Sequence, residues 1–117
     1  MKLLAALVLS VSLLTLSSCG TSSDPAGDWG VDRKGEPSLH LAKDGKVSGS
    51  DGCNRLMTTW KQDGDQIKFD IVAGTLMHCE GVDTWLSAMN SATVKGDVMT
   101  VKDSAGKEIG KLKRSAK

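Results

Sequence analysis

Hydrophobic and polar positions alternate along most of the chain, in short runs separated by turn-forming residues. A period of two is typical of β-strands, because successive side chains of a strand point to opposite faces of the sheet. The alternation is clearest at Ile67, Phe69 and Ile71, which are spaced two residues apart. On this pattern we expect strands over residues 29–33, 37–41, 47–50, 56–61, 67–71, 92–95, 98–102 and 108–113.

Turn signals lie between these runs. The segments 43–46 and 63–65 each contain an Asp-Gly pair, which supplies the positive φ that tight hairpin turns need. Short strands at this spacing are typical of a small sandwich or barrel. In the last run Ile109 and Leu112 have opposite parity. We therefore expect a β-bulge near Gly110, or an irregular edge.

One segment departs from the period of two. Val82, Trp85, Leu86 and Met89 are spaced as i, i+3, i+4 and i+7, which is the pattern of one helix face. We expect a short helix here that lies across the sheet and plugs one opening or face. The predicted fold class is mainly β: a small barrel-like antiparallel or mixed sheet with one short helix (α+β), stapled by a disulfide.

The N-terminus has the pattern of an export signal. Lys2 precedes an apolar run over residues 3–16, as in a secretory signal peptide, and the run is shorter than the roughly 20 apolar residues that a transmembrane helix needs. It ends in Leu-Ser-Ser-Cys at residues 16–19, which resembles the bacterial lipobox. We predict a lipoprotein signal peptide over residues 1–18, lipidation of Cys19, a flexible tether over residues 19–27 and one domain over residues 28–117.

The residue after Cys19 bears on the destination of the protein. In Gram-negative lipoproteins an aspartate at this position commonly marks retention in the inner membrane, and here the residue is Gly20. We expect the lipid to anchor the protein in the outer membrane, facing the periplasm. The alternatives are the inner membrane and the cell surface.

The length and net charge of the mature chain limit the number of domains and the kinds of partner that we expect. Removing residues 1–18 from 117 leaves 99, enough for one domain. The whole chain has 15 basic and 14 acidic side chains, and Lys2 leaves with the signal. The mature chain is therefore electrically balanced, and we expect no nucleic acid among its partners. We expect the mature protein to be a monomer.

Two cysteines remain after lipidation of Cys19. Export would place Cys53 and Cys79 where disulfides persist, and this favours a structural bond between them. The first alternative is a pair of free thiols. The second is a metal site that adds His40 and His78, although neither cysteine belongs to a C-x₂-C pair and the histidines have no i, i+4 partner.

Candidate catalytic residues do not form a recognisable motif. Nucleophilic catalysis needs a serine or cysteine beside a histidine that an acid orients. The chain offers Ser48, Ser50, His40, His78 and Asp51, without a nucleophile elbow. We expect no enzyme activity, no catalytic residues, no cofactor and no metal.

Aromatic and basic residues have mainly structural interpretations. We expect Trp29, Trp60 and Trp85 to fill the core between sheet and helix. The alternative is a ligand-stacking surface. The basic tail over residues 107–117 is interpreted as a solvated edge that opposes strand-to-strand aggregation, with contact to anionic envelope polymers as the alternative.

A pair of motifs carries a family resemblance. The sequence Ser-Gly-Ser-Asp-Gly-Cys-Asn-Arg-Leu at residues 48–56 is followed by Thr-Leu-Met-His-Cys at residues 75–79. These segments resemble the G-x-x-G-C-N and T-x-x-x-C elements of the META domain family of HslJ-like heat-inducible lipoproteins. The resemblance covers residues 28–113. Its motif residues in this chain are Gly49, Gly52, Asn54 and Thr75, with the two cysteines.

The resemblance implies a compact β-barrel-like fold, a disulfide between the paired cysteines, and links to heat shock, antibiotic tolerance or secretion, without an assigned biochemical activity. The motif also has a physical interpretation of its own. Gly52 allows a tight turn and Asn54 bonds to nearby backbone, so the two would direct Cys53 toward Cys79. The alternative is a ligand-binding loop.

Our leading hypothesis is a non-enzymatic envelope lipoprotein, stress-related, that binds another protein or a small hydrophobic molecule in the periplasm. The runner-up is a small inhibitor lipoprotein that blocks a lytic enzyme or protease through an exposed loop. A hydrolase or metal-dependent enzyme is third. An apolar groove near the helix would favour ligand binding, a rigid protruding loop would favour inhibition, and a deep pocket joining His40 or His78 to a carboxylate would favour the enzyme.

Overall fold

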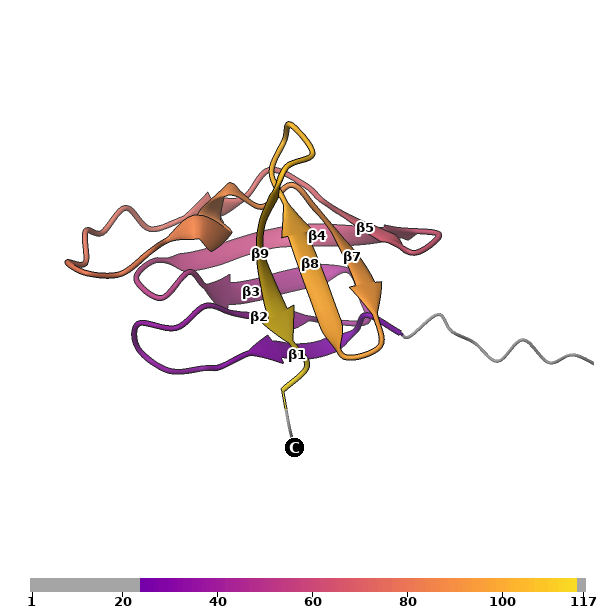
Figure 1. The fold of residues 1–117 in the computed structure, drawn as a ribbon, viewed down its shortest axis with the longest axis horizontal. Helices are drawn as coiled ribbons and strands as arrows, with labels where there is room; N and C mark the ends of the chain where they lie inside the picture. Colours follow the sequence, from indigo (N-terminus) through magenta and orange to yellow (C-terminus); the bar gives the residue numbers. More distant parts are fainter. Residues whose placement is uncertain (1–23, 116–117) are drawn as a thin grey trace, which may run out of the picture.

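The chain folds into a nearly closed β-barrel (Figure 1), seen in a computed structural model that describes residues 24–115. The predicted signal peptide, Cys19 and most of the predicted tether lie outside the described residues. The strands are β1 (Gly27–Gly30), β2 (Ser38–Leu41), β3 (Lys46–Ser50), β4 (Arg55–Asp63), β5 (Gln66–Phe69), β6 (Ala73–Gly74), β7 (Ser91–Lys95), β8 (Val98–Lys102) and β9 (Glu108–Lys113), and η1 is a 3-10 helix (Trp85–Ala88).

The sheet runs in the order β1-β2-β3-β4-β5-β7-β8-β9, and β6 adds to β4. Every strand pair among the described residues is antiparallel. An antiparallel bridge between Trp29 and Arg114 brings the end of β9 back to β1. The predicted mainly β, barrel-like fold is confirmed, and the sheet is antiparallel rather than mixed.

The core fills the inside of the barrel with the inward side chains of each strand. Trp29 is completely buried, and its indole Nε1 donates to the carbonyl oxygen of Pro25 at 2.9 Å. Trp60 and Trp85 are partly buried and pack against the core. The expectation that the tryptophans serve the core holds best for Trp29, which offers no surface for stacking a ligand. The other buried apolar side chains are Leu39, Leu41, Val47, Leu56, Ile67, Phe69, Leu86, Met89, Ala92, Val94, Met99, Val101 and Leu112.

The N-terminal end of the domain differs from the sequence-based expectation. The first strand was expected over 29–33 and occupies Gly27–Gly30, with Gly27 opposite Leu41. Pro25 is buried, and the guanidinium of Arg114 donates to the carbonyl oxygens of Asp24 and Ala26 at 3.0 and 3.3 Å. The last residues of the expected tether, 24–27, are thus packed against the end of the chain.

The expected helix over residues 82–89 is reduced to the single 3-10 turn of η1. Its N-terminus has no side-chain cap, and Asn90 already accepts a hydrogen bond from Phe69 in the sheet. The apolar stripe still points inward, because residues three apart eclipse in a 3-10 helix: Leu86 and Met89 are both buried. Among residues 24–115, no helix has the length and apolar character needed to cross a membrane.

The sheet has two irregularities, one in β9 and one between β5 and β6, and each is caused by one extra residue. In β9, Gly110 pairs with Val101 and Glu108 pairs with Lys102, so Ile109 is the extra residue. The bulge expected near Gly110 is confirmed. The ring of Trp85 lies where a side chain at Gly110 would be, 2.6 Å from an ideal Cβ, so the bulge seats η1 against β9.

The second irregularity corrects the strand expected over 67–71. Phe69 pairs with Trp60 and Ala73 with Met57, so the three residues 70–72 lie opposite the two residues 58–59. The carboxylate of Asp70 accepts a hydrogen bond from the Ile71 N–H at 2.8 Å. This N–H is therefore not used in the hydrogen bonds between strands. Ile71 leaves the strand and is 89% exposed, although its spacing from Phe69 continues the alternation.

Candidate functional site

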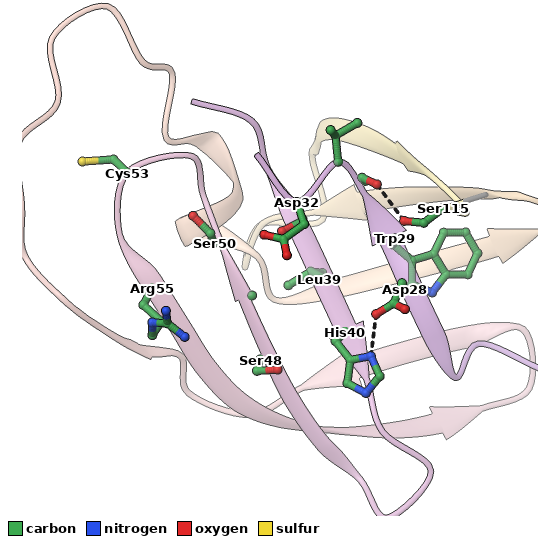
Figure 2. Close-up of a pocket in the computed structure, with 14 residues that line it drawn as sticks. Asp28, Trp29, Asp32, Leu39, His40, Ser48, Ser50, Cys53, Arg55 and Ser115 are labelled. Carbon is green, nitrogen blue, oxygen red and sulfur yellow. Dashed lines mark hydrogen bonds and ion pairs between the residues drawn. The ribbon is translucent and has the colours of Figure 1, made fainter. Parts of the chain in front are cut away.

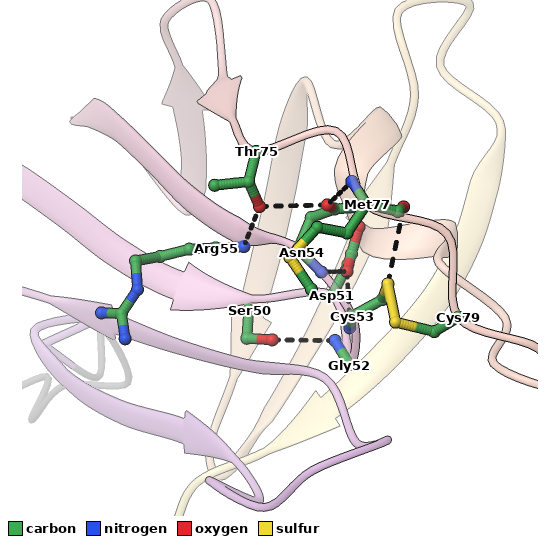
Figure 3. The surroundings of a disulfide bond; sticks show 9 residues. All are labelled: Ser50, Asp51, Gly52, Cys53, Asn54, Arg55, Thr75, Met77 and Cys79. Atoms are coloured by element: carbon green, nitrogen blue, oxygen red, sulfur yellow. Dashed lines mark hydrogen bonds between the residues drawn. A yellow bond between two sulfur atoms is a disulfide. The ribbon is translucent and has the colours of Figure 1, made fainter.

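The disulfide joins the turn after β3 to the loop before η1 (Figure 3). Cys53 and Cys79 are bonded, with their Cα atoms 5.7 Å apart and 26 positions apart in sequence. The predicted bond is confirmed. Because both sulfur atoms are used in it, the alternatives of free thiols and of a thiolate metal site do not apply to this state of the protein.

A buried aspartate shapes the turn that carries Cys53. The Asp51 side chain is completely buried, and its Oδ1 accepts hydrogen bonds from the backbone N–H groups of Cys53 and Asn54. Its other oxygen has no hydrogen-bond partner among the described residues. Asp51, a candidate catalytic acid in the sequence, therefore acts here as a turn residue.

The two motif glycines lie where the backbone is crowded. Gly52 has φ +99°, and an ideal Cβ there would lie 3.0 Å from Val82 Cγ1. At Gly49, in β3, an ideal Cβ would overlap the carbonyl oxygen of Ser38 and lie 3.0 Å from the Cα of Leu39. Glycine thus lets β3 pack closely on β2 and lets the turn reach the loop before η1.

Asn54 and Thr75 join the same two segments as the disulfide (Figure 3). The Asn54 Oδ1 accepts from the Thr75 hydroxyl at 3.0 Å and from the Met77 N–H. The Asn54 Nδ2 donates to the Met77 carbonyl oxygen at 3.1 Å, and the Thr75 hydroxyl oxygen accepts the Arg55 N–H at 3.0 Å. The disulfide and the hydrogen bonds of Asn54 and Thr75 therefore explain the two motifs together, and we call them the clamp, because they fix residues 75–79.

This clamp presents apolar side chains to solvent. Leu76 is 100% exposed, Met77 59% and Met57 60%. Residues 71–77 contain no charged side chain, and among residues 24–115 no strand pairs with the side of β6 that faces away from β4. We call Met57, Ile71, Leu76 and Met77, together with the open side of β6, the apolar edge.

A hollow beside η1 continues this surface. It has a volume of about 400 Å³, and Ile71, Val72 and Met89 are among its lining residues. It is the nearest feature to the apolar groove that was expected to favour ligand binding. Asp70 and Ser87 also line it, so the hollow is a mixed extension of the apolar edge.

A second hollow of about 750 Å³ lies over β1, β2 and β3 (Figure 2). Asp28, His40 and Ser48 form one row across these strands, and the Asp28 Oδ1 lies 2.6 Å from the His40 Nδ1. Arg55 and Ser50 line the other end. The groove is open, and the side chains of His40 and Asp28 are 53% and 63% exposed.

This row has the residue types of a hydrolase triad without its geometry. Within the described residues no hydrogen bond joins Ser48 to His40. Since β2 and β3 pair on both sides, their backbone N–H groups are held in the sheet and do not converge on an oxyanion. The pocket joining His40 to a carboxylate exists, and it is an open groove in which both side chains are exposed.

The remaining metal-ligand candidates are scattered. His78 is exposed in the loop before Cys79, whereas His40 lies on β2. Across residues 24–115 no three histidine, cysteine, aspartate or glutamate side chains gather closely enough to hold a metal ion.

A model of the META domain family matches residues 15–116. The chain belongs to the META domain family. In this META domain, the motif residues are those that join the β3–β4 turn to residues 75–79, through Asn54, Thr75 and the disulfide. No curated protein and no solved structure matches the chain.

Sequence reasoning missed two parts of this META domain. The apolar edge was not recognised, although an uncharged run over residues 71–77 next to turn residues is a signal for an exposed, association-prone segment. The pairing of Asp28 with His40 was also missed. It joins residues 12 positions apart on neighbouring strands, and only the strand register brings them together.

Proposed function

We propose that this META domain is a non-enzymatic, lipid-anchored envelope protein that binds an extended apolar segment of another exported protein along the apolar edge. Membership of the META domain family is consistent with a non-enzymatic envelope protein. We further propose an HslJ-like role in the response to heat or antibiotic stress, in the outer membrane facing the periplasm.

The apolar edge carries the proposal. An unpaired strand offers backbone N–H and C=O groups to any extended chain, and natural proteins usually protect such edges with charges, proline or a covering loop. Residues 71–77 contain neither charge nor proline. Leu76 and Ile71 are almost completely exposed beside β6. An apolar strand added to this edge would gain ladder hydrogen bonds and bury these side chains.

The clamp supports the proposal through preorganisation. Binding costs free energy when a flexible loop must be ordered. Here the disulfide and the hydrogen bonds of Asn54 already fix the backbone at Met77 and Cys79. The loop therefore loses little conformational freedom when a partner binds.

A photoreactive amino acid at position 76 tests the proposal in cells. We expect crosslinks to another exported protein from position 76 and none from position 44, in the exposed β2–β3 turn. In a second arm the probe sits at position 71, and Leu76→Asp should abolish its crosslinks without changing the melting temperature. Equal crosslinking from positions 44 and 76, or crosslinks only to a second copy of this chain, would contradict the proposal.

A second candidate function is inhibition of a lytic enzyme or protease. Leu76 is fully exposed on a loop that the disulfide holds, and inhibitors often present such a loop. The same crosslinking decides between the two functions. An inhibitor would crosslink from position 76 to the active-site cleft of a hydrolase, and Leu76→Asp would restore the activity of that enzyme.

The lipid anchor has its own test. Cys19→Ala should move the protein from the membrane fraction to the soluble periplasmic fraction, because the acyl chains contribute about 0.8 kcal/mol per buried CH₂ and are lost. Fractions are washed at about 1 M salt, at which the screening length falls to about 3 Å and surface charge attraction is removed. Membrane retention of Cys19→Ala after this wash would contradict lipid anchoring.

A further inference from the structure

Six lysines share one outer face of the barrel. In β5, β7, β8 and β9 the buried apolar side chains point inward, so the alternate positions, the half-exposed Val98 among them, point out. The end of β4 continues this face. We call the following residues the lysine face: Lys61, Lys68, Lys95, Lys102, Lys111 and Lys113.

The strand register concentrates these charges. Lys61 lies directly opposite Lys68, and Ser91 lies between Lys68 and Lys102 on the same row. Like charges directly opposite each other destabilise a sheet. The arrangement therefore costs stability, and folding alone does not explain it.

None of the six lysines of the lysine face forms an ion pair with another described residue. In the described part of the chain two ion pairs form, His40 with Asp28 and Arg114 with Asp97, and neither includes one of the six lysines. Thr93 and Thr100 occupy the middle of the face. Glu108, at the start of β9, lies directly opposite Lys102 without forming an ion pair. The other carboxylates of this half of the barrel lie in turns or at strand ends: Asp63, Asp65, Asp97 and Asp103. A chain with balanced total charge thus has one strongly basic surface.

The described chain begins at one end of this surface. Arg114 directly follows Lys113, and its guanidinium donates to the Asp24 carbonyl oxygen at 3.0 Å. Its backbone N–H donates to the Asp97 carbonyl oxygen, in the turn after Lys95, at 2.8 Å. In Figure 1 the start of β1 lies beside the end of β7. Cys19 is five residues before Asp24, which is at most about 17 Å of extended chain.

We propose that the lysine face lies on anionic phospholipid headgroups of the membrane that holds the anchor. The geometry rests on the lipid anchor proposed above, since the short tether keeps this end of the face near the bilayer. Juxtamembrane basic side chains are attracted to anionic lipid surfaces, and six lysines that form no ion pair with another described residue match such a surface.

The register also gives the orientation of the apolar edge. Gly27, at the anchored end of β1, lies in the same row as Leu41 and Val47. At the other end of these strands Gly30 lies in the same row as Ser50 and Arg55, next to the disulfide turn. With the anchored end near the bilayer, the disulfide and residues 75–77 of the apolar edge, which are hydrogen-bonded to Asn54 and Arg55, lie at the far end, free for a partner.

The test uses the mature chain with Cys19→Ser, so that binding does not depend on lipid. We expect it to co-sediment at low salt with vesicles containing about one third phosphatidylglycerol, and not with phosphatidylcholine vesicles. Binding should disappear at about 1 M salt. The triple change Lys68→Glu, Lys95→Glu and Lys111→Glu should weaken binding by at least about tenfold.

A matched control makes the same charge change elsewhere. Arg33→Glu, Lys34→Glu and Arg55→Glu lie outside the lysine face and should leave vesicle binding unchanged. Lys68→Glu places opposite charges across from Lys61, so the first variant should not melt lower than the unsubstituted chain. An equal loss in both variants, equal binding to neutral vesicles, or no binding by the unsubstituted chain would each overturn the proposal. Since no lipid anchor is present, these outcomes are independent of the Cys19→Ala result.

Discussion

Replacing Cys53 by serine lowers the melting temperature of the oxidised protein by about 15–25 °C. The bond closes a loop with a sequence separation of 26, and constraining such a loop in the unfolded chain is worth about 3.5 kcal/mol. For a domain of this size about 1 kcal/mol corresponds to roughly 4–8 °C. Thermal unfolding followed by circular dichroism in non-reducing buffer measures the shift.

Two comparisons separate the effect of losing the disulfide on the melting temperature from the effect of changing the Cys53 side chain. The double variant Cys53→Ser, Cys79→Ser should melt close to the single variant, because either change breaks the bond. The unsubstituted protein in reductant should melt close to both. Coincident melting of the single variant and the oxidised protein would mean that the bond contributes nothing to stability.

Gly49→Ala destabilises the domain by about 3 kcal/mol, the upper part of the range for overpacking. The added methyl group would overlap the Ser38 carbonyl oxygen and lie 2.9 Å from Leu39 Cδ2. The backbone of β2 cannot move away without breaking its pairing with β3. Urea denaturation measures the free energy of unfolding.

Ser48→Ala is the matched control for this substitution. Ser48 is the preceding residue of β3 and points outward into the groove, so its replacement should change the free energy of unfolding by less than about 0.5 kcal/mol. If Gly49→Ala were as stable as Ser48→Ala, the close approach of β2 and β3 would not be the reason for glycine at this position.

The period of two predicted most of the sheet because most strands have one buried face. Leu39 and Leu41 are buried while His40 between them is exposed, and Ile109 and Leu112 revealed the bulge through their parity. The alternating pattern gave a wrong strand end where an apolar side chain at a position expected to face inward is exposed. Ile71 continues the spacing of Ile67 and Phe69, yet it lies on the surface, and no local property of isoleucine could show this.

The candidate site was predicted in part. The motif spacing and the expected export indicated the disulfide between Cys53 and Cys79. The partners of Asn54 could not be found from sequence, because Thr75 and Met77 are more than 20 positions away. The lysine face was missed for the same reason. Lys61, Lys68 and Lys102 come from different strands, and only the register makes them neighbours.

The junction of the first and last strands has a consequence for how the protein is made. Trp29 bridges to Arg114, the Arg114 guanidinium lies 4.2 Å from the Trp29 ring centroid, and the Ser115 N–H donates to Asp28. These contacts span nearly the whole described sequence, so Trp29 is enclosed only after Arg114 and Ser115 have been synthesised. A nascent chain that has not yet reached Arg114 therefore cannot close the barrel. Such non-local closure is slow, and until β1 and β9 meet the apolar side chains of the core stay open to aggregation.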